Sequence, residues 1–156
     1  EAETKLEEAN AKVEKAETPE ERSEAVNEQE KQQNAVVDFA ELLKQYNSKK
    51  EKSLDDILDF HYHFERIHPF QDGNGRVGRL IMFKECLANK IVPFIITDEL
   101  KYFYYRGLSQ WKFVKEYLRD TCLTAQDNYK KVLEYLRVNK TTRQQVKMSL
   151  PWRLNI

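Results

Sequence analysis

The spacing of apolar residues predicts helices over the first part of the chain. Alanine, leucine and valine recur with a 4-3-4-3 spacing from residue 2 to residue 16, which is typical of a helix with a narrow apolar seam. Thr18 and Pro19 interrupt this seam, and proline is favoured at the first position of a helix, so we expect a second helix to begin there. Residues 27–34 are wholly polar and are either a solvated helix or a linker. An apolar face resumes at Val36, Phe39, Ala40 and Leu43.

The central segment predicts two more helices, separated by a proline and a glycine cluster. Ser53 is followed three residues later by Asp56, which resembles a capping box at a helix start. The helix behind it should end before Pro69, and its apolar face comprises Ile57, Phe60, His61, Phe64 and Ile67. We expect His61 to be half-buried on this face. Beyond the glycines we predict a largely buried helix to about Asn89, with apolar positions at Val77, Leu80, Ile81, Phe83 and Leu87.

The last third of the chain is also mostly helical in pattern. Residues 91–96 are the only strand-like run, and Pro93 restricts them to an edge strand or an extended linker. Thr97 can cap a short helix to Arg106, and we expect the aromatic residues 102–105 on it to lie in the core. Apolar spacing from residue 111 to residue 137 predicts one or two amphipathic helices. The predicted fold class is therefore all-α, a compact helical bundle.

The distribution of charge divides the chain into three parts. Residues 1–34 contain eleven glutamates and five basic residues, which predicts a charged, helical N-terminal segment with a weak case for helix pairing. Residues 35–138 hold nearly all the aromatic side chains and should form the core. Residues 139–156 carry four basic residues and no acidic one, which predicts a basic C-terminal tail.

Composition excludes several classes of protein. The 156 residues carry 26 basic and 26 acidic side chains, and zero net charge argues against a nucleic-acid binder. No apolar run approaches the roughly 18 residues that span a membrane. Two cysteines cannot form a disulfide framework, so we expect free thiols and a cytoplasmic location. The chain begins with Glu1 and shows no signal peptide, which indicates a piece of a longer protein.

Candidate chemistry concentrates in residues 68–79, which read HPFQDGNGRVGR. Three of the four glycines of the chain fall here, between a predicted helix end and a predicted helix start, where free amides can form a nest for an anion. Asp72 offers a carboxylate to magnesium, and Arg76 and Arg79 share a helix face from which both can reach phosphate oxygens. His68 can take a proton from a hydroxyl near neutral pH. Together these are the parts of a phosphoryl or nucleotidyl transferase.

Two other interpretations of the same segment remain open. Residues 73–78 match the dinucleotide-binding pattern G-x-G-x-x-G, and Asp98 follows about 20 residues later. That motif should directly follow a buried strand, whereas a proline and charged residues stand before Gly73, so the context disfavours it. Alternatively, the glycines and arginines form only a tight turn between helices with solvated charges.

The segment resembles the signature of Fic-domain proteins, H-P-F-x-[D/E]-G-N-G-R-x-x-R, at every motif position, and residues 53–135 resemble the helical Fic core. The resemblance implies a protein adenylyltransferase, which transfers AMP from ATP to a Tyr, Ser or Thr hydroxyl of a target protein and releases pyrophosphate. It implies Mg²⁺ as cofactor and residues 35–138 as the catalytic core. The implied roles are base for His68, loop anchor for Phe70, magnesium ligand for Asp72, anion hole for Gly73, Asn74 and Gly75, and phosphate clamp for Arg76 and Arg79.

One motif position bears on the choice of reaction. In the related Doc toxins, which are kinases, a lysine stands where this chain has Gly75, so the resemblance favours adenylylation. Alternatives are a non-catalytic helical module that binds nucleotide or a partner, and a transferase of the same fold that uses another phosphate donor.

Two elements of the family are missing from the sequence pattern. The inhibitory motif [S/T]-x-x-x-E-[G/N] is not matched, and residues 4–9 come nearest but end in alanine. We therefore expect that inhibition, where it exists, comes from a segment cut away or from a separate antitoxin-like partner. Residues 1–52 contain no glycine and no hairpin signal, so the flap that docks the target cannot be placed.

Overall fold

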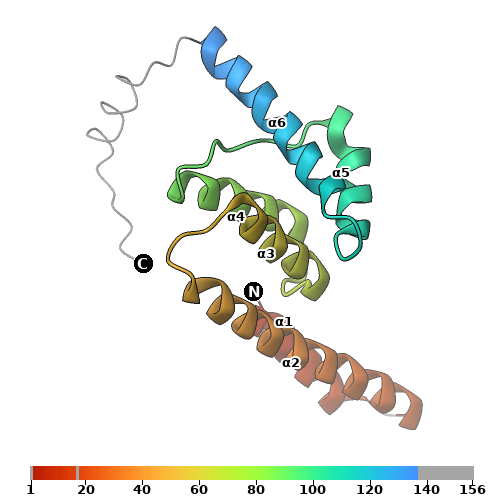
Figure 1. Cartoon of the computed structure of the whole chain (residues 1–156). Helices are drawn as coiled ribbons and strands as arrows, with labels where there is room; N and C mark the ends of the chain where they lie inside the picture. Colours follow the sequence, from red (N-terminus) through yellow and green to blue (C-terminus); the bar gives the residue numbers. More distant parts are fainter. Residues whose placement is uncertain (1, 17, 137–156) are drawn as a thin grey trace.

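The computed structural model describes residues 2–16 and 18–136, and these form a bundle of six helices without a strand (Figure 1). The all-α prediction is confirmed. The helices are α1 (Ala2–Lys15), α2 (Pro19–Ser48), α3 (Leu54–Ile67), α4 (Asn74–Ala88), α5 (Asp98–Gln110) and α6 (Glu116–Tyr135). The tail predicted at 139–156 lies outside the described residues.

Helices α1 and α2 form a hairpin, and its far end projects away from the other four helices (Figure 1). Helix α2 begins at Pro19, as predicted, and Thr18 caps it by forming a capping box with Glu21. Helix α2 runs unbroken through residues 27–34, which are therefore part of a helix and not a linker. The two helices pair with Ala9 of α1 and Ala25 of α2 buried, and the Lys12–Glu28 salt bridge flanks the contact. The expected helix pairing is therefore present.

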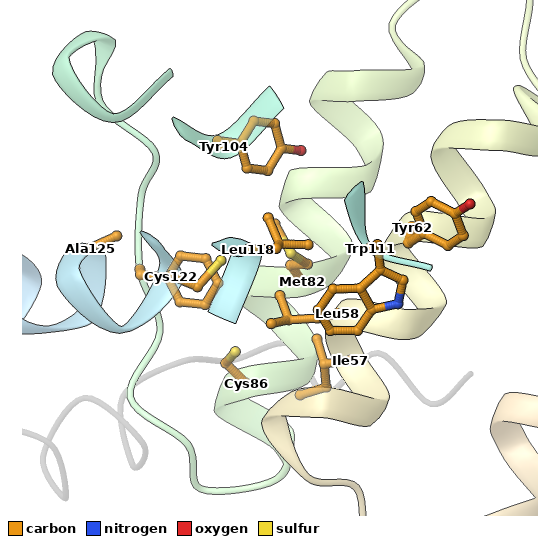
Figure 2. Packing of buried hydrophobic residues seen from close by; sticks show 11 residues of the cluster. Ile57, Leu58, Tyr62, Met82, Cys86, Tyr104, Trp111, Leu118, Cys122 and Ala125 are labelled. Carbon is orange, nitrogen blue, oxygen red and sulfur yellow. The ribbon is translucent and has the colours of Figure 1, made fainter. Parts of the chain in front are cut away.

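The core lies between α3, α4, α5 and α6. Tyr46 ties α2 to this core, because its hydroxyl donates to Glu85 of α4 over 2.9 Å. The buried cluster comprises Ile57, Leu58, Tyr62, Met82, Cys86, Phe94, Tyr104, Trp111, Leu118, Cys122 and Ala125 (Figure 2). Both cysteines are buried free thiols, as expected. Burial of this apolar area is the main driving force for the fold.

Helix α3 begins at the capping box predicted from the sequence. Ser53 accepts from the Asp56 amide, and the Asp56 carboxylate accepts from the Ser53 amide over 3.0 Å. The same carboxylate pairs with Lys49. Hydrogen bonds from Lys49 and then Ser53 lower the pKa of Asp56 to about 2.

Some predicted core positions are wrong. Leu80 is 69% exposed and Leu87 is also exposed, because α4 turns Gly78, Met82 and Cys86 toward the core instead. Of the aromatic residues 102–105 only Tyr104 is buried. His61 is fully buried rather than half-buried. Residues 91–97 form an extended connection.

No described helix has the length and apolar content needed to cross a membrane.

Candidate active site

The segment 68–73 forms the loop between α3 and α4. Helix α3 ends at Ile67, and His68 caps it in the left-handed conformation at φ 49°, with its amide donating to the Phe64 carbonyl over 3.1 Å. Pro69 is buried and cannot continue the helix. The chain therefore reverses at His68, whose side chain remains 61% exposed at the mouth of the loop.

Phe70 and Asn74 hold the loop on the core. The Phe70 ring lies 5.9 Å from the Phe64 ring and 6.0 Å from the Phe39 ring, centroid to centroid, so it inserts between α2 and α3. The Asn74 side chain accepts from the Phe70 amide over 2.9 Å and donates to the Phe70 carbonyl over 2.7 Å. Both ends of the Asn74 side-chain amide are therefore used to brace the loop, and its backbone N–H is one of the free amides at the start of α4.

The start of α4 offers a nest of amides. Gly73 adopts φ 75°, a left-handed conformation that glycine reaches without strain, and α4 begins at the next residue. The first amides of a helix, here those of Asn74, Gly75 and Arg76, have no acceptor within the helix and carry its positive dipole end. A Cβ on Gly75 would lie 3.1 Å from Nη1 of Arg79, so glycine lets this guanidinium fold close to the nest. This arrangement suits a phosphate group.

Asp72 stands at the rim of the nest. One of its carboxylate oxygens accepts from the Gly73 amide over 2.6 Å, and the other lies 3.2 Å from Nη2 of Arg76. Its side chain is 92% exposed. No group of three or more metal-ligating residues occurs among the residues that the structure describes, so a metal here would rely on this one carboxylate. That donor set fits Mg²⁺, which commonly binds one or two carboxylates and completes its shell with water and phosphate oxygens.

A buried polar cluster lies beneath the nest. Nε2 of His61 makes a 2.5 Å hydrogen bond with the Tyr104 hydroxyl of α5. Glu65 lies between two imidazoles: its Oε1 is 3.7 Å from Nε2 of His61, and its Oε2 is 3.9 Å from Nε2 of His68. The positive charge of Arg79, on α4, lowers the pKa of both His61 and Glu65. The cluster therefore connects α3, α4 and α5 directly under the motif.

Burial sets the charges in this cluster. Desolvation, with the positive charge of Arg79, lowers the pKa of His61 to about 3, so this ring is neutral at pH 7. Burial raises the pKa of Glu65, whereas the charges of His68 and Arg79 act in the opposite direction. Burial also raises the pKa of the Tyr104 phenol, which stays protonated.

A cleft opens beside His68. Its volume is about 690 Å³, and it lies between the α1–α2 hairpin and the end of α3, with Lys5, Asp38, Arg66 and His68 among its walls. At the loop, the Gln71 side chain donates to Glu8 of α1 over 3.1 Å. The hairpin therefore forms one wall of the approach to His68.

The structure places the predicted site residues 68–79 on one loop and the first turns of α4, and the roles predicted for them stay predictions. The cluster of His61, Glu65 and Tyr104 below them was not predicted from the sequence. Glu65 stands four residues after His61 and three before His68, and this spacing places all three on one side of a helix. That signal was available. The contribution of Tyr104 was not, because it is 43 residues from His61.

The Fic/DOC family pattern matches residues 5–86, just over half of the chain. The chain belongs to the Fic/DOC family. It is also similar to a probable protein adenylyltransferase of Aquifex aeolicus (strain VF5), with 39% identity over 57 residues. That match covers 35% of this chain and 18% of the relative, so the chain spans less than a fifth of the length of that relative.

Proposed function

We propose that this Fic-domain chain transfers AMP from ATP to the hydroxyl of a Tyr, Ser or Thr side chain on a target protein, with release of pyrophosphate. One observation carries the proposal. Glu65 lies 3.9 Å from Nε2 of His68 and would lie 3.8 Å from a Cβ on Gly75, so the imidazole and the amide nest border the same carboxylate. A base next to an anion site is what transfer from a nucleotide to a hydroxyl requires. Family membership and the named relative support it.

The nest and the arginines supply the binding of the triphosphate. The amides of Asn74, Gly75 and Arg76 would donate to phosphate oxygens, and the guanidinium groups of Arg76 and Arg79 would neutralise the outer phosphates. Asp72 would hold Mg²⁺, which when bound neutralises phosphate charge. Because Arg76 lies 3.2 Å from Asp72, this contact would open as Arg76 turns to the phosphates.

His68 would act as the base. The hydroxyl oxygen of the target attacks the α-phosphorus, the bond from this phosphorus to the bridging oxygen breaks, and the electron pair leaves with pyrophosphate. The hydroxyl proton passes to His68. We expect the target side chain to approach through the cleft of about 690 Å³, because His68 forms part of its wall. A separate inhibitory protein would act by covering the same approach.

Gly75 favours transfer of AMP over transfer of the γ-phosphate. A Cβ at this position would lie 3.1 Å from Nη1 of Arg79, so this guanidinium would have to shift to make room for a side chain. With glycine here, Arg79 stays free to receive the outer phosphates while the α-phosphate faces His68.

Labelled ATP tests the proposal. Purified chain is incubated with Mg²⁺ and either α- or γ-labelled ATP, with a cell extract as the source of targets, and label on protein is measured. We expect label from α-labelled ATP only, a loss of about 100-fold or more in His68→Ala, and no change in Lys130→Ala, an exposed residue of α6 that does not line the cleft.

Other outcomes would contradict the proposal. Label from the γ position would indicate a kinase of the same fold. ATP binding without label on any protein would indicate a module that only binds nucleotide. Equal labelling in His68→Ala would remove this residue as the base.

A further inference from the structure

Glu65 is a carboxylate that the proposed binding of nucleotide leaves without a role. It lies in the last turn of α3, its side chain is only 17% exposed, and its Oε1 is enclosed without a hydrogen-bond partner among the described residues. An enclosed carboxylate oxygen without a donor is costly. A favourable interaction with a positive charge must therefore offset the cost of burying this carboxylate.

The compensating charges are those of His68 and Arg79. His61 is the nearest ring at 3.7 Å, but burial holds it neutral, so it gives the carboxylate no charge. The positive charges that act on Glu65 from other residues are His68, first, and Arg79. Oε2 of Glu65 lies 3.9 Å from Nε2 of His68, so a positive charge on this ring would be attracted to the carboxylate.

The backbone fixes this geometry from both sides. A Cβ on Gly78 would lie 2.7 Å from Oε1 of Glu65 and 2.8 Å from Cε1 of His61, so α4 can cover this carboxylate only with glycine at this position. On the other side, His68 takes a left-handed conformation at φ 49°, which is strained for a residue other than glycine. This turn brings its ring back to 3.9 Å from Oε2 of Glu65.

We propose that Glu65 is a positioning residue for His68: its carboxylate orients the exposed imidazole toward the loop and stabilises the imidazolium that forms when the target hydroxyl loses its proton. This inference rests on the proposed adenylyl transfer, in which His68 is the base. At 3.9 Å the two groups are beyond hydrogen-bond distance, so the exposed His68 side chain would have to rotate to bring an N–H to Oε2. Glu65 itself exchanges no proton with the target.

Other titratable groups, charged and neutral, face this pair from the neighbouring elements. On the buried side these are Arg79 on α4, His61 on α3 and the Tyr104 phenol on α5. On the side of the cleft they are Lys5, Glu30, Lys31, Asp38, His63 and Arg66. Asp72 and Arg76 pair with each other in the loop. The positive charges that lower the pKa of Glu65 are those of His68, first, and then Arg79.

The first experiment measures the imidazole directly and needs no activity. The chain has three histidines, so the ring signals of His68 can be assigned by NMR with His61 and His63 as internal references. In Glu65→Gln, which keeps the shape and removes the charge, we expect the His68 signals to titrate about 0.5–1 pH unit lower than in the wild type. The signals of exposed His63, on the same helix, should not move. An unchanged His68 titration would overturn the proposal.

The second experiment measures transfer of label from α-labelled ATP against pH. We expect Glu65→Gln to lower kcat about 10-fold, to leave KM for ATP within about 3-fold, and to move the acidic limb of the profile to lower pH. A purely structural role of Glu65 would lower kcat at every pH without this movement, and that result would overturn the proposal. Glu116→Gln, which removes a carboxylate 3.8 Å from Arg119 on α6, is the matched control and should behave as wild type.

Glu65→Asp keeps the charge and covers the case in which Glu65→Gln fails to fold. We expect His68 in this variant to titrate within about 0.3 units of wild type, because the carboxylate remains next to the ring. A shift as large as that predicted for the uncharged variant would overturn the proposal. If the wild-type chain transfers no label at all, the proposed function fails, while the NMR titration still decides whether Glu65 acts on His68.

Discussion

Replacing Asn74 with alanine removes two hydrogen bonds that hold the active-site loop. The side chain accepts from the Phe70 amide and donates to the Phe70 carbonyl, and the residue is only 7% exposed. Each such bond contributes about 1 kcal/mol net, and a Phe70 group left without water adds up to about 1 kcal/mol more. The higher helix propensity of alanine returns about 0.5 kcal/mol. We therefore expect a loss of about 2 kcal/mol.

The other end of α4 offers a matched control for this substitution. The Asn89 side chain also makes two bonds, because it accepts from the Lys52 amide over 3.1 Å and donates to the Glu85 carbonyl over 2.9 Å. Asn89→Ala should therefore cost about the same in stability. Since only Asn74 braces the amide nest, only Asn74→Ala should weaken the binding of ATP, by about 10-fold or more.

Urea unfolding and ATP titration test this pair. A loss of about 2 kcal/mol corresponds to a fall in Tm of roughly 4–8 °C for a chain of this size. The reasoning would be refuted if Asn74→Ala unfolded within about 0.5 kcal/mol of wild type with normal ATP affinity. It would also fail if Asn89→Ala lost ATP binding to the same degree, because the effect would then not be specific to the loop.

Three further predictions concern the packing of helices, the dependence on pH and the phosphate clamp. A Cβ on Gly107 would lie 2.6 Å from the Leu118 Cα, so Gly107→Ala should force α5 and α6 apart. We expect it to lower the free energy of unfolding in urea by about 1–3 kcal/mol. The control is Gly75→Ala, whose Cβ meets only the end of the Arg79 side chain and which should be near neutral in stability. The lowered pKa of Asp56 contributes stability that is fully present above about pH 4 and is lost as pH falls through about 2. After discounting for solvent screening, this contribution is about 1 kcal/mol. Asp56→Asn should therefore flatten the plot of unfolding free energy against pH in this range. Arg79→Glu should weaken ATP affinity strongly because it sets a carboxylate against the outer phosphates, and unchanged affinity in a titration would remove Arg79 from the clamp.

The helices and the loop could be predicted from the sequence because the signals that specify them are local. The capping box at Ser53 depends on a residue three positions away, and Pro69 ends α3 through its own ring. The motif from His68 to Arg79 is consecutive in the sequence, so the positions of the free amides, the Asp72 carboxylate and the two arginines follow from one turn between two helices. Family membership follows from the same residues.

Sequence spacing could not decide which side of α4 is buried. Leu80 and Leu87 are as hydrophobic as core residues, yet α4 presents Gly78 and Met82 to the core because only glycine leaves room for the Glu65 carboxylate beneath it. The direction of the Asn74 side chain was equally undetermined, since an amide at a helix start can face an anion or brace a loop.

The sequence by itself therefore determined the all-α class, the helix boundaries around the motif and the chemical groups of the loop, because each depends on residues within a few positions of one another. Only the tertiary structure decided what lies beneath the loop. The meeting of Glu65, Arg79 and Tyr104 joins three helices across up to 39 positions of sequence. Packing in three dimensions, not spacing along the chain, sets the distances and the desolvation that give these groups their charges.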